Sequence, residues 1–164
     1  LLQDYPLELH IFSAQTYEQL ESQGIKGEKL FVHSHESYDE ILKLQHNAGI
    51  LFLPLAIEST ITEVIRTSAP GKLGEYLASG TPVLAHVPAD SFVAYYFKKY
   101  RCGFLADQND PKRLAVEIKK LIDDPVVQTE IIQNAYRQAM LDFSPDHARD
   151  QLKKLLQNRD TTDK

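Results

Sequence analysis

At 164 residues, 43% hydrophobic and 25% charged, the chain has the size and make-up of one globular domain with a sizeable core. The formal net charge of -5 argues against a nucleic-acid partner. The single cysteine, Cys102, excludes a disulfide framework and fits a reducing compartment, so we expect a cytoplasmic protein. No apolar run reaches the roughly 20 residues of a membrane-spanning helix, and no signal peptide is recognisable. The chain does not begin with Met, and we expect that it was cut from a longer protein.

Short apolar runs alternate with helical patterns over residues 7–106. The expected strands are residues 7–12, 30–32, 50–55, 83–85 and 103–106. The expected helices run from about Ala14 to a stop at Gly24, from a cap at Ser34 to Ala48, from Pro70 to a stop at Gly80, and from Phe92 to Tyr100. We expect residues 56–69 to form a polar loop. The alternation predicts an α/β fold, a Rossmann-like parallel sheet with helices on both faces.

The last third of the chain carries three similar helix starts. Asp110-Pro111, Asp124-Pro125 and Ser144-Pro145 each place a capping residue before a proline at the first helical position. Apolar residues follow each start at helical spacing, so we expect three consecutive helices. We therefore predict one Rossmann-like domain over residues 1–157 and a frayed polar tail over residues 158–164.

Residues 70–85 read PGKLGEYLASGTPVLA and place one lysine and one glutamate in the first two turns of a helix. Ligands of open parallel sheets bind beyond the carboxyl ends of the strands, and this helix lies at that edge. A helix N-terminus offers unpaired N–H groups and about half a positive charge. Lys72 adds a full positive charge where the dipole does not favour one, and Gly71 has no side chain to block a close ligand. This combination suits a bound phosphate.

Two interpretations of Lys72 and Glu75 stay open. In the first, Ser68 or Ala69 caps the helix, a phosphate lies at its N-terminus, and the Glu75 carboxylate accepts hydrogen bonds from the vicinal hydroxyls of a ribose. In the second, Lys72 and Glu75 form an exposed i,i+3 ion pair worth about 0.2–0.5 kcal/mol, and no ligand is involved.

The segment resembles the C-terminal, nucleotide-sugar-binding domain of the group 1 retaining glycosyltransferases, which have the GT-B fold. The matching motif residues are Pro70, Lys72, Leu73, Glu75, Tyr76, Leu77, Ala78, Gly80, Pro82 and Val83. Further matches are Gly103-Phe104-Leu105 with Asp107, Asn109, Asp110 and Pro111, then Asp123-Asp124-Pro125, Asn134-Ala135 and Phe143-Ser144. The resemblance covers most of residues 7–156, and the ordered series is more specific than any single motif.

The resemblance implies the donor-binding half of a glycosyltransferase, which moves a sugar from a nucleotide diphosphate sugar to an acceptor without a metal or other cofactor. It implies that Glu75 binds the ribose and that the amides of residues 71–73 face the diphosphate, with Lys72 close by. It also places Ser13 beside the ligand and residues 32–34 beside the nucleobase. The residues expected to bind the donor are Ser13, His33, Ser68, Pro70, Gly71, Lys72, Leu73 and Glu75.

The chain departs from the family pattern in two ways. Thr67 stands where many members carry a first glutamate, and either Glu58 or Glu63 could substitute for it, so no catalytic residue is assigned. The family's first strand, the basic residues that accompany it and the N-terminal acceptor-binding domain are also absent. We therefore expect the fragment alone to be inactive, and the intact enzyme could associate peripherally with a membrane.

Other residues have simpler interpretations. We expect His33 and His35 to be capping or exposed residues rather than metal ligands, since no further ligand is suitably spaced. His86 follows a buried strand and is a weaker cleft candidate. The aromatic residues of 92–100 are expected to pack in the core rather than to form a stacking platform. Cys102 is expected to be a small buried hydrophobe, because no histidine is placed to activate it.

Two other functions fit the same fold, because fold does not determine function. One is a non-catalytic module that binds a nucleotide or another protein. The other is a GT-B-like sugar-nucleotide epimerase.

Overall fold

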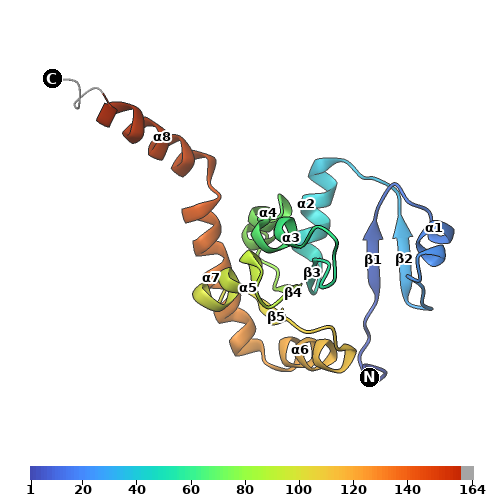
Figure 1. Cartoon of the computed structure of the whole chain (residues 1–164). Helices are drawn as coiled ribbons and strands as arrows, with labels where there is room; N and C mark the ends of the chain where they lie inside the picture. Colours follow the sequence, from blue (N-terminus) through green and yellow to red (C-terminus); the bar gives the residue numbers. More distant parts are fainter. Residues whose placement is uncertain (160–164) are drawn as a thin grey trace. The chain divides into compact units, whose positions relative to one another are not determined.

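A computed structural model of the chain describes residues 1–159 and separates into two compact units, Leu1–Leu44 and the part from Gln45 onward (Figure 1). Both units contain parallel strands flanked by helices, which confirms the predicted α/β class. The strands form two sheets, with β1 beside β2 in one and the order β3-β4-β5 in the other. The single domain over residues 1–157 stays a prediction.

The first unit is built around strands β1 (Leu9–Phe12) and β2 (Leu30–His33), which pair in parallel. Helix α1 (Tyr17–Ser22) connects them and begins three residues later than expected, because Thr16 caps it. The Thr16 hydroxyl accepts from the Gln19 amide while the Gln19 side chain accepts from the Thr16 amide, a reciprocal capping box.

Helix α2 (Tyr38–Asn47) also begins later than the sequence pattern indicated. The predicted cap at Ser34 is wrong, because the Ser37 hydroxyl accepts a hydrogen bond from the Glu40 amide at 3.3 Å. Ser37 and Glu40 are three residues apart, which is the spacing of a capping box. The sequence contained this signal, but the prediction based on apolar spacing did not use it.

The second unit is built around β3 (Leu51–Pro54), β4 (Val83–His86) and β5 (Phe104–Ala106), all parallel. The first three residues of β4 are almost completely buried, as expected of a central strand with both faces covered. The helices are α3 (Thr62–Thr67), α4 (Lys72–Ala78), α5 (Phe92–Tyr100), α6 (Pro111–Asp123), α7 (Pro125–Asp142) and α8 (Pro145–Arg159).

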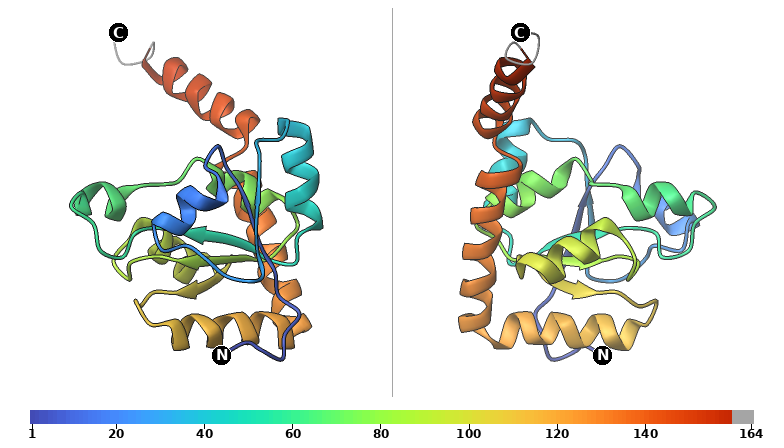
Figure 2. Two further views of the ribbon diagram at one scale, coloured as in Figure 1. Left: turned by 90° about the vertical axis from the view of Figure 1, so that its right-hand side faces the viewer. Right: turned by 60° about the vertical axis from the view of Figure 1, so that its left-hand side comes forward.

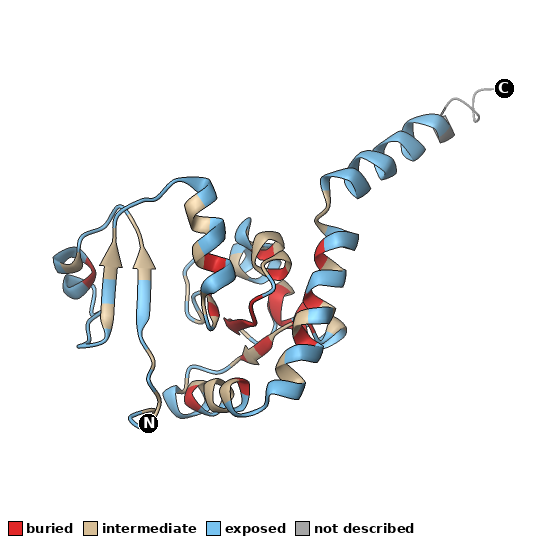
Figure 3. Cartoon of the chain, turned by 180° about the vertical axis from the view of Figure 1, so that it is seen from behind, coloured by how far each residue is buried: buried red, intermediate tan, exposed pale blue. Residues whose placement is uncertain are grey.

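Helices cover both faces of this sheet, and the buried residues gather on the strands and the helix sides that meet them (Figures 2 and 3). On one face, α4, α5 and α7 contribute Leu73, Leu77, Val93, Phe97, Ala135 and Ala139. On the other face, Leu121 of α6 and Ile131 of α7 pack with Leu84 and Phe104. Helix α7 thus contributes to both core clusters.

Three local expectations for this unit need correction. The predicted loop over residues 56–69 contains the short helix α3. Helix α4 begins at Lys72, and its N-cap is Gly71 rather than Ser68 or Ala69. Ser68 instead terminates α3, where its hydroxyl donates to the Val64 carbonyl. A hydroxyl residue such as Ser68 at the end of a polar segment can close one helix or open the next. The sequence pattern alone did not distinguish these two roles.

The three consecutive helices predicted for the last third of the chain are present. Asp110 and Asp124 cap α6 and α7, each followed by proline. Helix α8 includes residues 158 and 159, and the remainder of the predicted frayed tail, 160–164, lies outside the described residues. None of the helices within residues 1–159 has the length and apolar content that crossing a bilayer requires.

The aromatic helix α5 is largely a core element, as predicted. Tyr96 and Phe97 are buried, whereas Tyr95 is 56% exposed and lies under the Lys99 ammonium group. The Tyr96 hydroxyl donates to a carboxylate oxygen of Asp142 at 2.5 Å, which ties α5 to the end of α7. Burial and this carboxylate raise the pKa of Tyr96, so the phenol remains a donor at any ordinary pH.

Gly103 provides a direct test of core packing. A Cβ at this position would lie 2.1 Å from a ring carbon of the buried Phe97, so Gly103→Ala should lower the free energy of unfolding by about 1–3 kcal/mol. Gly49→Ala is the matched control, because nothing lies within 4 Å of its Cβ position. Urea denaturation of both variants would measure the difference, and equal stability would contradict this packing.

Cys102 is completely buried, and burial raises the pKa of its thiol to about 12, with a further contribution from Asp142. Because the thiolate is the nucleophile, alkylation by iodoacetamide at pH 8 should be about a thousandfold slower in the folded chain than in guanidinium chloride. Rapid labelling of folded protein would show that Cys102 is accessible and ionised.

Candidate functional site

The carboxyl edge of the β3-β4-β5 sheet is where ligands of open parallel sheets bind. Three segments leave the sheet at this edge. Residues 55–71 follow β3 and include α3, residues 87–91 follow β4, and residues 107–110 follow β5. Backbone hydrogen bonds continue just beyond the strands, from the Leu55 amide to the His86 carbonyl and from the Val87 amide to the Ala106 carbonyl.

Helix α4 starts at this edge and carries most of the predicted donor site. Lys72 is exposed at its first position, and Gly71 precedes it without a side-chain cap. The Leu73 side chain is completely buried, and its amide donates to the Pro70 carbonyl at 2.8 Å. Leu73 and Pro70 therefore anchor the turn, and of the three expected amides only those of Gly71 and Lys72 lack a hydrogen-bond acceptor within residues 1–159.

Glu75 lies one turn into α4 and is half-buried. Burial raises the pKa of the adjacent Tyr76, and the Glu75 carboxylate raises it further because two negative charges would lie close together. A carboxylate held at this depth, near the first turn of α4, has the chemistry to accept hydrogen bonds from a diol.

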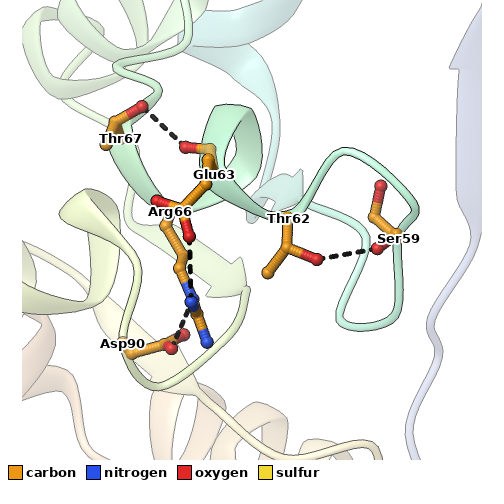
Figure 4. Close-up of polar contacts among 6 residues, drawn as sticks. All are labelled: Ser59, Thr62, Glu63, Arg66, Thr67 and Asp90. Carbon is orange, nitrogen blue, oxygen red and sulfur yellow. Dashed lines mark hydrogen bonds and ion pairs between the residues drawn. The ribbon is translucent and has the colours of Figure 1, made fainter.

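A second charged group at this edge was missed by the sequence analysis. The Arg66 guanidinium of α3 contacts Asp90 in the segment after β4, with 2.7 Å from Nε to a carboxylate oxygen (Figure 4). It also contacts Glu63 one turn earlier in α3, at 3.2 Å from Nη1. The pair from Arg66 to Asp90 joins residues 24 positions apart, and no local pattern in the sequence indicated it.

A small cavity of about 70 Å³ lies between α3 and the segment after β4. Its lining residues are Ala56, Ile57, Ser59, Thr62, Ile65, Arg66, Pro88 and Asp90. The Thr62 hydroxyl donates to the Ser59 carbonyl at 2.8 Å, which closes the loop before α3 on itself (Figure 4). The cavity holds about two water molecules, far less than a nucleotide sugar occupies.

Thr67, which stands where many family members carry a glutamate, turns back on its own helix. Its hydroxyl donates to the Glu63 carbonyl at 2.7 Å (Figure 4). Of the two residues considered as substitutes, Glu58 is exposed, and the Glu63 side chain is 84% exposed with its carboxylate on Arg66. Glu58 and Glu63 are therefore both open to solvent, and both remain candidates to replace the family's first glutamate.

Ser13 and His33 lie together at the carboxyl ends of β1 and β2 in the first unit. The Ser13 amide donates to the His33 carbonyl at 3.0 Å, and the Ser13 hydroxyl accepts from the Gln15 amide. The His33 ring stacks on Phe12 with 4.6 Å between ring centroids, and its Nε2 lies 2.9 Å from Nδ1 of His10. The other six predicted residues belong to the second unit.

His86 has a structural contact at the sheet edge. Its Nε2 donates to the Gln108 carbonyl at 3.1 Å, which joins the end of β4 to the segment after β5. Over residues 1–159, no group of three or more His, Cys, Asp or Glu side chains is arranged to hold a metal ion.

Comparison with known proteins agrees with the fold. Residues 12–138 match the family model described as "Glycosyl transferases group 1". The chain is also similar to the crystal structure of WaaG, "a glycosyltransferase involved in lipopolysaccharide biosynthesis", with a TM-score of 0.57 and 19% identity. No curated protein sequence matches the chain.

The two similarities differ in what they show. The match to WaaG covers 80% of this chain and 33% of that chain, so this chain spans about a third of the length of WaaG. At this identity the likeness shows a shared Rossmann-like fold and no more. The family model covers more than three quarters of the sequence, and the chain belongs to the group 1 glycosyltransferase family.

Proposed function

We propose that this chain is the C-terminal, donor-binding half of a retaining glycosyltransferase of the GT-B type, and that it binds a nucleotide diphosphate sugar. One observation carries the proposal. The family motif puts Lys72 and Glu75 in the first turns of α4, and α4 starts at the carboxyl edge of a parallel sheet.

The diphosphate would lie at the start of α4. The amides of Gly71 and Lys72 would donate to phosphate oxygens, and the Lys72 ammonium group would balance the charge that develops as the diphosphate leaves. Pro70 and Leu73 would hold this turn in place through their mutual hydrogen bond. Ser68, which closes α3, would border the site from the preceding segment.

The nucleoside would be recognised by separate groups. Glu75 would accept hydrogen bonds from the two ribose hydroxyls, as acidic residues do in dinucleotide-binding folds. Ser13 and His33 would lie beside the donor and its base. No metal or other cofactor takes part in this scheme, and it names no catalytic base.

In this proposal, the acceptor site would lie on a second domain. This chain spans about a third of WaaG, which supports the proposal that an N-terminal acceptor-binding domain would complete the enzyme. The chain alone would then bind the donor without transferring the sugar. We further propose that the intact enzyme is cytoplasmic and associates with a membrane only peripherally.

A non-catalytic nucleotide-binding module on the same fold is the second candidate. Thr67 favours it, because the position near the donor sugar lacks a carboxylate and the Thr67 hydroxyl closes α3. Consumption of a sugar nucleotide would distinguish the two candidate functions, since only the enzyme consumes one.

Nucleoside diphosphate binding tests the proposal directly. Titration calorimetry with UDP and GDP should show weak binding by the wild-type chain, and Glu75→Ala should raise the Kd about tenfold through the loss of two charge-assisted hydrogen bonds. The wild-type chain should bind the 2′-deoxy form of the nucleotide more weakly than the ribose form. Glu75→Ala should bind the two forms with nearly the same Kd, because the carboxylate that contacts the ribose is gone.

Glu130→Ala is the matched control, because Glu130 is an exposed carboxylate paired with Arg101 away from the site. Its Kd should equal that of the wild-type chain. Equal affinity of wild type and Glu75→Ala would refute the ribose role, and the absence of binding by either nucleotide would refute the donor site as a whole.

A further inference from the structure

The segment that carries Arg66 is weakly attached to the rest of the second unit. None of the six described residues of α3 is buried, and Ile61 and Val64 are more than half exposed. By contrast, the segment after β4 is firmly held, because Val87 and Ser91 are almost completely buried and the Ser91 hydroxyl caps α5. A loosely packed side and a firmly packed side therefore face each other across the small cavity.

The ion pair from Arg66 to Asp90 bridges these two sides (Figure 4). Beyond Leu55, whose amide is bonded to the His86 carbonyl, segment 56–67 has its own internal hydrogen bonds, from Thr62 to Ser59 and from Thr67 to Glu63. The contact of Arg66 with Glu63 lies within α3 and does not restrain the segment. The pair with Asp90 is thus the charged contact that fixes the segment to the sheet edge.

This ion pair is suited to exchange. The two side chains are 43% and 56% exposed, and exposed ion pairs contribute little to stability because water competes for both charges. The planar guanidinium fork binds phosphate oxygens through two parallel hydrogen bonds, which a single carboxylate contact through Nε does not match. With Glu63 and Asp90 both in place the cluster has a net charge of about -1, which opposes the approach of an anion.

We propose that residues 56–67 form a lid over the donor site, latched by Asp90 in the free protein, and that Arg66 leaves Asp90 to bind the diphosphate of the incoming nucleotide. The proposal rests on the proposed function and adds a diphosphate ligand from α3, just before the start of α4. Asp90 then acts as a competitor that weakens nucleotide binding, and Arg66 is the residue that the competitor and the ligand share.

The latch can be tested without ligand by hydrogen exchange. Asp90→Asn should speed amide exchange in residues 59–67 at least threefold, because the only change is the loss of the charge that holds Arg66. Glu130→Gln is the matched control, since it removes the carboxylate from another exposed arginine pair, with Arg101, and should leave this segment unchanged. UDP or GDP should slow exchange of the segment in both wild type and Asp90→Asn.

Nucleotide affinity tests the exchange of partners. Asp90→Asn should lower the Kd for the bound nucleoside diphosphate about fivefold, and Arg66→Gln should raise it about fivefold. In the Arg66→Gln background, Asp90→Asn should have less than a twofold effect, because the competitor acts through Arg66. Binding of the nucleoside without phosphates should not respond to any of these changes.

The outcomes separate this inference from the proposed function. Nucleotide binding that depends on Glu75 but not on Arg66 or Asp90 would overturn the lid and leave the donor site intact. An equal gain in affinity from Asp90→Asn with and without Arg66 would also overturn it, since the effect would then be one of overall charge. Unchanged exchange in Asp90→Asn would show that no latch exists, and the absence of nucleotide binding would overturn both proposals.

Discussion

The burial of strand β4 on both faces is the constraint on which the second unit depends. Val83, Leu84 and Ala85 have almost no exposed surface, and successive side chains of a strand point to opposite faces. One face therefore needs the cover of α4, α5 and α7, and the other needs α6 and α7. Because α7 serves both clusters, a change in its packing would reach the whole unit.

This packing also orients the candidate site. Leu73 and Leu77 lie on the buried side of α4, so the same helix must present Lys72 outward at its first turn. Gly74 lets Phe143 approach closely, since a Cβ there would lie 2.8 Å from the Phe143 side chain. Most of the family motif therefore maintains the position of α4, and few of its side chains remain for a ligand.

The later family residues have similar structural roles. The Asn134 side chain donates at 3.2 Å to the carbonyl of Arg101, the left-handed residue that caps the end of α5, and Ala135 is buried in the core. These contacts explain why an ordered series of short motifs can identify the fold with so few ligand-binding residues. In contrast, α3 in the segment after β3 has no buried residue and contributes little to the core, which leaves it free to vary.

The sequence alone determined the elements whose signals are local. Alternating apolar runs predicted the parallel strands, Asp110 and Asp124 marked α6 and α7, and Gly24 and Gly80 marked the ends of α1 and α4 with positive φ angles. The family motif likewise pointed to Lys72 and Glu75. These signals are readable because a cap or a helix stop depends on residues only a few positions apart.

Only the tertiary structure decided which of these residues meet. In the structure, Ser68 ends α3 and Gly71 caps the start of α4. The Leu73 amide, which was expected to face the diphosphate, already donates to the Pro70 carbonyl. The tertiary structure also joined Arg66 to Asp90 across two separate crossovers. Such contacts form because parallel strands bring segments that are distant in the sequence to one edge of the sheet. Local sequence patterns span only a few residues and therefore do not predict them.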